Sequence, residues 1–578
     1  MKESSCSGGF DATAVVINAQ PFPEEFEQPS TIACYWASLV AQHGPRPFIR
    51  DGTHETTGHE IDALSSDIAA ELVARGHVPG SRVGILMASG ASWIACFIAV
   101  QRIGGVAVLL STLMAPPELT HAIGHAQIAT LLVSPTVMGR DMLSALEIAL
   151  PGLTNARGSE TLALEAAPRL TAIIADGAAP AWAAASLDAI ERAASAASAR
   201  ELASLAASID PYAPALMMYT SGSTAHPKAV IHSGAAVTDK LATLASARTL
   251  IPVGLEPGDR ILVNAPFFWV GGFLFAFGAF AAGATVQLIE GRIPQAILDA
   301  IEDHALTHID GSEPVLRDLA AIAPPGHRFH ALRPLHASHR AFFTESAGRP
   351  RACALGSIGM TETLGPHSGN LETTELDHPT DAPLGRALPG MEYRIVDPES
   401  RAPLGAGEPG ELLVRGRWLM LGLYGTTATA TFDADGFYAT GDLCSLDEQG
   451  FLRFRGRLSG MIKTSGANVS PEEVELALEC HHDVIGAAVF GLPDPQRGEI
   501  VTAVIALRPG ANRDPAVYAA GLKQRLSPFK VPRRLLVRDL ADLPLTASRK
   551  IDRRALRERI IAELSTTEQP TQQGEQLV

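Results

Sequence analysis

The sequence predicts an α/β protein with a large N-terminal domain, in which helices cover parallel sheets, and a small α+β C-terminal domain. Three observations carry this prediction. Amphipathic segments alternate with short apolar runs from about residue 61, which is typical of parallel strands joined by crossover helices. Residues 408–456 hold short strands separated by glycines, which indicates a small β-barrel-like part. From about residue 457 a smaller mixed α+β pattern begins.

The predicted elements of the large domain alternate along the chain. Helices are favoured where apolar residues recur with the helical period, and buried strands where short apolar runs such as RVGILM stand between them. The order is helix 61–75, strand 82–87, helix 92–103, strand 106–110, helix 117–125 and strand 130–133. This alternation predicts consecutive βαβ units and therefore a parallel sheet with helices on both faces.

The small C-terminal unit has its own helices and strands. The predicted elements are helix 471–479, strands 487–490 and 501–507, and helix 516–526. The polar start of the chain and its Gln/Thr-rich end lack an apolar period, which is typical of unpacked termini. We therefore expect a loose N-terminal arm (1–28), the large domain (29–456), the small and mobile domain (457–565) and a disordered tail (566–578).

The charge balance excludes two classes of partner. The chain of 578 residues has a formal net charge of -16 and a pI near 5.6. Binding nucleic acid requires a basic patch and binding an anionic membrane surface requires polybasic segments, so neither partner is expected. The 6 cysteines never form a CxxC pair, and the N-terminus has no apolar signal core. A cytoplasmic location is therefore expected.

One uncharged stretch is long enough to span a bilayer. Residues 265–289 carry no charged side chain. Pro266 and the glycines that follow divide the stretch into short pieces, so we expect a loop, a buried helix and a strand of a large α/β core instead.

The strongest local signal for chemistry is segment 219–228 (YTSGSTAHPK), which follows the apolar run 215–218. Glycine and small hydroxyl residues let a backbone wrap closely around a phosphate, and a lysine adds a mobile positive charge. The lysine stands last, so the segment differs from a P-loop, and an ordinary Ser/Thr-rich turn is the alternative. The candidate phosphate ligands are Thr220, Ser221, Gly222, Ser223, Thr224 and Lys228.

Four further segments carry candidate residues. They are 356–362 (GSIGMTE), 438–442 (YATGD), 456–463 (GRLSGMIK) and 544–553 (PLTASRKIDR). Glu362 beside a phosphate site is a candidate magnesium ligand, because magnesium binds a few carboxylates together with phosphate oxygens. Asp442, at the end of a predicted strand, can accept hydrogen bonds from ribose hydroxyls. Each of these segments alone is a weak to moderate signal.

Taken together, the order and spacing of these segments are specific. The chain resembles the ANL superfamily of adenylate-forming enzymes, and most closely its acyl-CoA synthetase branch. The resemblance covers about residues 30–560 and includes 110–112 (LST), 116–119 (PPEL) and 528–533 (PFKVPR).

The resemblance implies two half-reactions. A carboxylate attacks the α-phosphate of Mg-ATP to give an acyl-adenylate and pyrophosphate. The small domain then rotates, and the thiol of CoA attacks the adenylate to release AMP. The implied cofactors are ATP/AMP, CoA and Mg2+. Such catalysis consists of positioning and of neutralising charge at phosphorus.

The resemblance also implies a role for each matching residue. Lys550, Thr361 and Glu362 are the catalytic candidates, with Lys550 at the carboxylate and α-phosphate, Thr361 at the α-phosphate and Glu362 at the metal. Residues 220–224 and Lys228 hold the β- and γ-phosphates. The remaining candidates are Ser357, Ile358 and Gly359 beside the nucleotide, Asp442 and Arg457 at the ribose, Ser465 and Gly466 in the CoA channel, and Ser459 at the domain hinge.

Residues 266–272 (PFFWVGG) match the family's acyl-pocket segment, and the acyl-binding candidates are Trp269, Gly271 and Gly356. Amino-acid-activating relatives place an aspartate in this region, whereas Phe268 and Trp269 stand here. We therefore expect an apolar or aromatic acid. Plain core packing is the alternative interpretation of Trp269.

Four departures from the family pattern concern the adenylation step. They are Ala225 and Ala229 in place of glycines, Ile358 in place of a tyrosine, Ser459 in place of Asp or Lys, and Arg549 in place of the glycine before Lys550. An alanine that must adopt positive φ costs about 1–2 kcal/mol. The thioester-forming half-reaction therefore has better support than adenylation.

Several activities stay open at this point. The first is a complete acyl-CoA ligase. The alternatives are an enzyme that only forms the thioester, from acyl-adenylate supplied by a separate adenylating enzyme, and a ligase that transfers the acyl group to a carrier protein or an amine. A non-catalytic binding protein is disfavoured because the lysine, acidic and arginine candidates are all present. The resemblance implies a monomer or homodimer.

Overall fold

The computed structural model describes residues 29–157, 161–190, 202, 204–220, 227–246, 255–289, 294–303, 306–310, 319, 322–323, 332, 357–369, 384–458, 460–544 and 551–567. The chain divides into two compact units. The second comprises Arg457–Val578 with the short segments Leu113–Glu118 and Ser221–Pro227, and the first comprises the rest.

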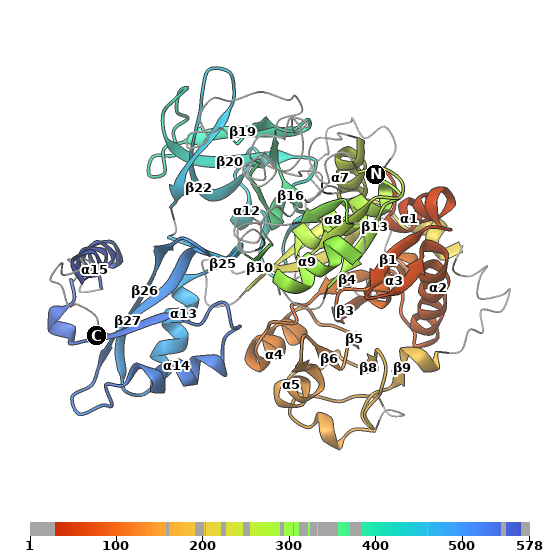
Figure 1. Cartoon of the computed structure of the whole chain (residues 1–578), viewed down its shortest axis with the longest axis horizontal. Helices are drawn as coiled ribbons and strands as arrows, with labels where there is room; N and C mark the ends of the chain where they lie inside the picture. The colour runs from red at the N-terminus through yellow and green to blue at the C-terminus, as the bar shows by residue number, and fades with distance from the viewer. Residues whose placement is uncertain are drawn as a thin grey trace, which may run out of the picture. The chain divides into compact units, whose positions relative to one another are not determined.

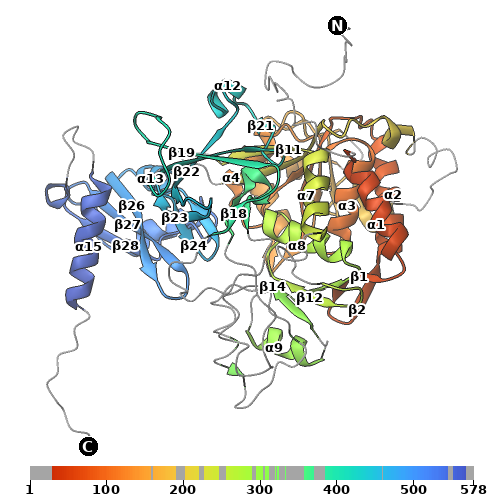
Figure 2. The same cartoon turned by 90° about the horizontal axis from the view of Figure 1, so that it is seen from above.

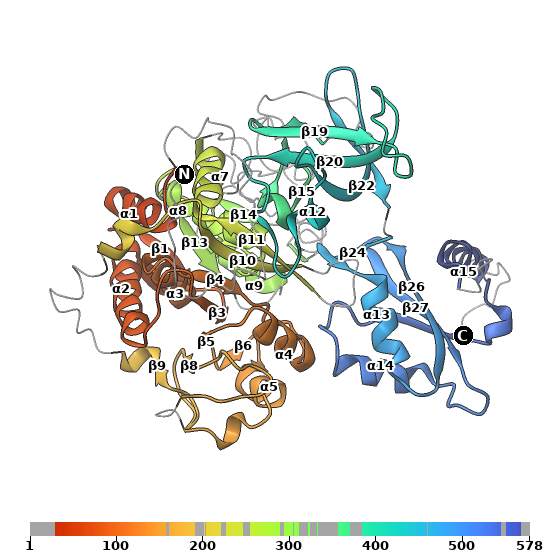
Figure 3. The ribbon, with the colours of Figure 1, turned by 180° about the vertical axis from the view of Figure 1, so that it is seen from behind.

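The larger sheet of the first unit has eight strands. In order they are β21 (Gly422–Leu423), β11 (Lys228–Ser233), β10 (Pro214–Thr220), β4 (Val106–Leu109), β3 (Arg82–Leu86), β5 (Thr130–Val133), β8 (Ala172–Ala175) and β9 (Ala185–Ser186). Neighbours from β10 to β9 run parallel, whereas β11 and β21 are antiparallel additions. Strands β3, β4, β5 and β8 are buried throughout, as expected for a sheet covered on both faces. Figure 3 shows β3, β4, β10 and β11 side by side.

A second sheet in the same unit has five strands. In order they are β14 (His308–Asp310), β12 (Arg260–Val263), β13 (Thr285–Leu288), β1 (Pro47–Asp51) and β2 (His54–Thr57). The first four run parallel, and β2 closes the edge as an antiparallel hairpin. Helices α8 (Val270–Ala281) and α9 (Pro294–Asp303) lie on opposite faces of this sheet (Figure 2).

The core lies between the two sheets. Helix α3 (Ala91–Arg102) packs on β3 and β4, α7 (Gly234–Ser246) on β10 and β11, and α8 on β12 and β13, while α1 (Ile32–His43) contacts all three helices. Aromatic rings join these helices. Trp36 packs edge-on against Phe277 with centroids 6.4 Å apart, and Phe97 packs against Phe277 at 5.6 Å. Helix α2 (Gly58–Ala74) covers α1 and α3 on the outside (Figure 1).

The part expected to be barrel-like is a four-stranded sheet. In order its strands are β19 (Met391–Val396), β20 (Gly410–Gly416), β22 (Tyr438–Leu446) and β23 (Leu452–Arg457), and the first three pair antiparallel. The shorter helices are α4 (Pro116–His125), whose residues from Leu119 on belong to the first unit, α5 (Met142–Ala149) and α12 (Ala428–Thr431). The short strand pairs are β6 (Thr136–Val137) with β7 (Arg140–Asp141), β15 (Gly359–Met360) with β16 (Gly365–Pro366), and β17 (Ser368–Gly369) with β18 (Arg386–Ala387).

The second unit is a sheet with helices on both faces. Its strands are β25 (Ala467–Val469), β24 (Ile462–Thr464), β27 (Gly498–Leu507) and β26 (Val484–Asp494), with β28 (Arg534–Arg538) parallel to β27. Side chains alternate between two cores, as the period of a strand requires. Val489 packs with helices α13 (Pro471–Glu479) and α14 (Pro515–Lys523), and Phe490 packs on the other face with α15 (Arg553–Thr567) (Figure 1).

The predicted α/β fold class is confirmed. Helix α13 has the predicted bounds, because the side chain of Ser470 caps its first turn and Pro471 begins it. Strand β26 is longer than the predicted 487–490, because it forms an extended ladder with β27. The uncharged stretch 265–289 contains α8 and β13, and in the described part of the chain no helix is long and apolar enough to cross a membrane. The predicted N-terminal arm, 1–28, lies outside the described residues.

Candidate active site

The candidate phosphate segment joins the two strands of one hairpin. Thr220 ends β10, Lys228 begins β11, and the two residues are partners in the antiparallel register. The hairpin therefore brings the first and last candidates of the motif together. Ser221, Gly222, Ser223 and Thr224 lie outside the described residues.

The strand leading into this segment is anchored by Tyr219. Its hydroxyl donates to the carbonyl of Ala122 over 3.0 Å and lies 3.0 Å from Nδ1 of His125, both on α4. Burial raises the pKa of Tyr219, so the phenol keeps its proton and stays a donor. On the other strand, the carbonyl of Ala229 accepts a hydrogen bond from the backbone N–H of Tyr424.

Thr361 and Glu362 lie at the tip of a tight turn. Gly359 of β15 pairs with Pro366 of β16, and the two candidates form a 3-10 turn between these strands. The turn closes through Gly365, whose φ is +91°. A Cβ on Gly359 would lie 2.5 Å from the backbone of Gly365, so this close approach requires glycine. The turn therefore presents both side chains from a fixed backbone.

Three carbonyls of this turn and of the strand that follows it accept hydrogen bonds from other elements. The carbonyl of Thr361 accepts from Nε2 of His232 over 2.7 Å, and that of Glu362 accepts from the backbone N–H of Met420 over 2.8 Å. The carbonyl of Pro366 accepts from Nζ of Lys240. Since His232 is on the same strand as Lys228, the turn is fixed to the hairpin that carries the phosphate candidates.

Glu362 links two of the sequence motifs. Its side chain is largely buried, with the residue 9% exposed, and Oε1 lies 3.4 Å from the hydroxyl of Tyr438, the first residue of the YATGD motif. A carboxylate oxygen near a hairpin with hydroxyl and ammonium groups is the kind of ligand that Mg2+ takes together with phosphate oxygens. The residues present thus fit a magnesium site.

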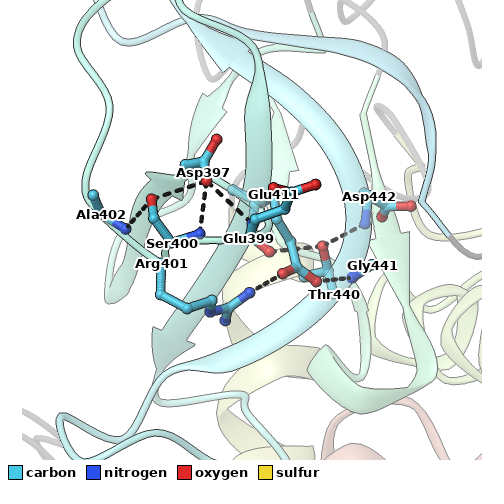
Figure 4. A network of polar contacts seen from close by, with 10 residues as sticks. Asp397, Glu399, Ser400, Arg401, Ala402, Glu411, Thr440, Gly441 and Asp442 are labelled. Carbon is cyan, nitrogen blue, oxygen red and sulfur yellow. Dashed lines mark hydrogen bonds and ion pairs between the residues drawn. The ribbon is translucent and has the colours of Figure 1, made fainter.

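Asp442 is held by its backbone within β22. Its N–H donates to Oγ1 of Thr440 over 3.1 Å, and that hydroxyl donates to the carbonyl of Leu412 over 2.8 Å. The N–H of the preceding residue, Gly441, donates to Oε1 of Glu411. The other carboxylate oxygen of Glu411 pairs with Arg401. The Asp442 carboxylate extends away from this network (Figure 4). A buried carboxylate with a fixed backbone is suited to accept hydroxyl donors.

The acyl-pocket candidates lie at the start of α8. Trp269 is the residue before the helix, with its ring 5.6 Å from that of Phe268. A Cβ on Gly271 would meet no atom within 4 Å, whereas one on Gly272 would lie 2.3 Å from the carbonyl oxygens of Ala265 and Pro266. Gly356 lies outside the described residues.

The nucleotide-flanking candidates Ser357 and Ile358 precede β15. The N–H of Ile358 donates to Oγ of Ser368 over 2.9 Å, and its carbonyl accepts from the N–H of His367 over 3.0 Å. The backbone at Ile358, where the family usually has a tyrosine, is therefore fixed.

The two alanines of the phosphate segment differ in what the structure says of them. Ala229 lies in a regular ladder and is not among the described residues with positive φ, so the backbone strain expected for an alanine in place of glycine does not apply to it. Ala225 lies outside the described residues.

The CoA-channel candidates belong to the second unit. Ser465 and Gly466 form the exposed two-residue turn between β24 and β25, with φ of +49° and +83°. The N–H of Ser465 donates to the carbonyl of Arg497, which fixes the turn. Arg457 ends β23 and begins this unit. The predicted hinge Ser459 and the lysine Lys550 lie outside the described residues.

Sequence reasoning missed the buried basic residues behind the turn. His232, Lys240 and His367 are fully buried. Burial lowers the pKa of His232 to about 4 and that of His367 to about 3, and it also lowers the pKa of Lys240. The available signal was a lysine within the largely small and apolar helix 234–246, since a lysine is normally solvated.

The chain is similar to known proteins over most of its length. Residues 36–424 match the AMP-binding enzyme family, and residues 473–550 match the AMP-binding enzyme C-terminal domain. A feruloyl-CoA synthase of Amycolatopsis sp is 29% identical over 88% of this chain and 95% of its own. A methyl-dioxo-octahydroindenyl-propanoyl:CoA ligase of Mycobacterium tuberculosis is 30% identical over 87% of this chain and 93% of its own.

Among solved structures, the amide bond synthetase McbA from Marinactinospora thermotolerans is similar. It has a TM-score of 0.71 and 26% identity, covering 91% of this chain and 99% of the other. The family match spans more than half of the sequence and includes the hairpin and the Thr361–Glu362 turn. The chain therefore belongs to the AMP-binding enzymes, within the ANL superfamily of adenylate-forming enzymes.

Proposed function

We propose that this enzyme is an acyl-CoA ligase, which converts an apolar or aromatic carboxylic acid to its CoA thioester through an acyl-adenylate. One observation carries the proposal. The Thr361–Glu362 turn is bonded through His232 to the strand of Lys228 and through Glu362 to Tyr438 of the Asp442 strand. Within the first unit, hydrogen bonds thus link the candidates for the α-phosphate and the metal to the strand of Lys228 and to the strand of Asp442.

In the adenylation step the chain supplies position and charge. Thr220 and Lys228 at the base of the hairpin hold the β- and γ-phosphates, and Thr361 holds the α-phosphate. Lys550 pairs with the substrate carboxylate and the α-phosphate, so that the carboxylate oxygen attacks phosphorus and pyrophosphate leaves. Glu362 would hold Mg2+, which would supply positive charge against the phosphate oxygens when bound. Asp442 and Arg457 hold the ribose of the nucleotide.

In the thioester step the CoA sulfur attacks the acyl carbonyl, and AMP leaves with the bonding electron pair. We assign the exposed Ser465–Gly466 turn to the pantetheine arm. Gly466 suits this role because a Cβ there would meet no atom within 4 Å, so a chain can pass close to its backbone.

The acid class is inferred from the α8 segment. Phe268 and Trp269 are paired aromatic rings, and no carboxylate stands in 265–272 to bind an amino group. The curated relatives named above act on a feruloyl and a polycyclic propanoyl acid, which agrees with an apolar or aromatic substrate. A smaller or more polar acid would lose the favourable burial against these rings.

A second candidate is transfer of the acyl group to an amine. It is favoured by the likeness to an amide bond synthetase over most of both chains. The two activities share the adenylation step and differ only in the acceptor.

The sequence departures gave reasons to expect a weak adenylation half-reaction. The regular backbone of Ala229 removes one of those reasons.

The test is a three-arm assay with mass-spectrometric detection. One arm offers a panel of acids with Mg-ATP and CoA, the second offers the matching acyl-adenylates with CoA, and the third offers acids with Mg-ATP and amines. We expect acyl-CoA in the first two arms. Product in the second arm alone would identify a thioester-forming enzyme that depends on a separate adenylating enzyme, and amide in the third arm alone would overturn the CoA proposal. Lys550→Ala is the control, since it should abolish the first arm and spare the second.

A further inference from the structure

Two buried donors lie behind the Thr361–Pro366 turn and have no role of their own in the chemistry proposed above. His232 of β11 and Lys240 of α7 are both 0% exposed. Basic side chains seldom lie in a protein interior without a specific partner, because burying them costs free energy. Here the partners are backbone carbonyls of the turn itself.

His232 must be the donor to Thr361. A carbonyl oxygen only accepts hydrogen bonds, so Nε2 carries the proton in the 2.7 Å contact. Burial lowers the pKa of the ring to about 4, so at neutral pH the imidazole is uncharged with its proton on Nε2. Its Nδ1 is buried and has no hydrogen-bond partner in the described part of the chain. The single contact that the ring makes through nitrogen is therefore with the turn.

Lys240 is aimed at the turn by a rigid group of neighbours. Its Nζ donates to the carbonyl of Pro366 and lies 3.8 Å above the ring of Trp418. The indole N–H of Trp418 donates to Asp239 over 2.7 Å, and Asp239 pairs with Arg417 at 3.0 Å. Because each member holds the next, the ammonium or amine group has little freedom to leave the carbonyl.

We propose that His232 and Lys240 are positioning residues, which hold the two ends of the Thr361–Pro366 turn and thereby place Glu362 for the metal and Thr361 for the α-phosphate. The inference rests on the proposed function, because it assumes those two roles. Neither residue touches the reacting atoms. Each acts by donating to a carbonyl of the turn and thereby attaching the turn to its own element, β11 or α7.

The geometry of the turn explains why the positions of Thr361 and Glu362 should depend on His232 and Lys240. The hydrogen bonds of the turn itself, such as those of the Thr363 hydroxyl with the carbonyls of Met360 and Gly365, close the turn internally and do not attach it to β11. The carbonyl of Thr361 accepts from His232 and from the N–H of Leu364, and the second bond is internal to the turn. Without His232 the tip is attached less firmly to β11. A displacement of about 1 Å at such a tip can lower the rate on the order of a hundredfold.

The test compares two variants that remove a donor with one that keeps it. His232→Leu and Lys240→Met remove the donors at similar volume, and His232→Gln keeps an N–H at comparable reach. The matched control is His77→Leu, since His77 is also buried and donates or accepts through Nε2, at 2.8 Å from Oγ1 of Thr130, away from the turn. We measure thermal unfolding, KM for Mg-ATP, kcat, and the Mg2+ concentration at half-maximal pyrophosphate release.

We expect KM for Mg-ATP and the half-maximal Mg2+ concentration to rise on the order of tenfold in His232→Leu and in Lys240→Met, and to return most of the way in His232→Gln. His77→Leu should lower the unfolding temperature and leave both constants unchanged. Unchanged constants in folded His232→Leu and Lys240→Met would overturn the inference. If His232→Leu does not fold, Lys240→Met decides.

Formation of acyl-adenylate by the wild-type protein distinguishes failure of the proposed function from failure of this inference. If the wild-type protein makes no acyl-adenylate from any acid, that proposal fails, and equilibrium titration with Mg-ATP replaces the kinetic constants. The inference then predicts the same tenfold weakening of Mg-ATP binding in the two donor-removing variants, and an affinity equal to that of the wild type would overturn it.

Discussion

Thr220 and Lys228 face each other across the β10–β11 hairpin as antiparallel register partners. The connection between them therefore starts and ends at adjacent points, with a hydroxyl at one end and an ammonium group at the other. This arrangement suits a phosphate group, because the charge and the hydroxyl approach it from the same edge of the sheet.

Replacing Lys228 tests this arrangement. Lys228→Met keeps most of the side-chain volume and removes the charge, so kcat/KM for Mg-ATP should fall by about 10- to 100-fold, the equivalent of one charge-assisted hydrogen bond. Thermal unfolding should change little, because the residue is half-buried at a strand end. The control is Lys523→Met on the exposed side of α14, which should match the wild type. An unchanged kcat/KM in Lys228→Met would argue against phosphate binding at the hairpin.

Thr440 supports Asp442 through one hydroxyl. Because Oγ1 accepts the N–H of Asp442 and donates to the carbonyl of Leu412, Thr440→Val leaves two buried backbone groups without a partner. We expect the free energy of unfolding to fall by about 1–3 kcal/mol and AMP to bind more weakly. Thr440→Ser keeps the hydroxyl and serves as the control. Urea unfolding and AMP titration of the three proteins check this, and wild-type AMP affinity in Thr440→Val would separate Thr440 from the nucleotide site.

The buried histidines predict how stability depends on pH. The pKa of His232 is about 4 and that of His367 about 3 in the folded protein, against about 6.5 in an unfolded chain. Burial is the main cause, and Lys240 adds to it. Below about pH 6.5 the unfolded state binds more protons, so the stabilisation is complete above that pH and is lost as pH falls toward 4 and 3.

This loss can be measured with one variant and one control. For His232 alone the difference corresponds to about 3 kcal/mol. Urea unfolding at about pH 7.5 and about pH 5 should give a smaller pH dependence for His232→Gln than for the wild type. His482→Gln should keep the wild-type slope, because that histidine is exposed. A slope common to all three proteins would show that His232 does not remain neutral in the folded state.

Candidate residues for the site could be chosen from the sequence because their signals are local. Thr361, Glu362 and Asp442 stand in short segments whose order along the chain is recognisable. The supporting residues could not be predicted in this way. His232 and Lys240 meet the turn across 129 and 126 positions of sequence, and nothing near them in the chain specifies that partner. The fold class was predictable because the alternation of helical and strand patterns of apolar residues can be recognised in the sequence without knowledge of tertiary contacts.

The acyl segment offers a matched pair of glycines. A Cβ on Gly272 would lie 2.3 Å from two carbonyl oxygens, whereas one on Gly271 would meet nothing within 4 Å. Gly272→Ala should therefore lower the unfolding temperature and the activity with every acid, because the backbone must shift. Gly271→Ala should leave the unfolding temperature unchanged and reduce kcat/KM for bulky acids more than for small ones. If both variants treat all acids alike, the open space at Gly271 is not part of the acyl pocket.

The two alanines of the phosphate segment can be separated by reverting each to glycine. Ala229 lies within the β10–β11 ladder, and it is not among the described residues with positive φ, so it has no backbone strain to relieve. Ala229→Gly should leave the rate of pyrophosphate release unchanged and lower the free energy of unfolding by about 0.5–1 kcal/mol, because glycine weakens a strand interior. If the adenylation step is weakened by this segment, only Ala225→Gly should accelerate it, by about 5- to 30-fold. Acceleration by Ala229→Gly would contradict the regular strand geometry, and no acceleration by either would leave the adenylation step without a defect in this segment.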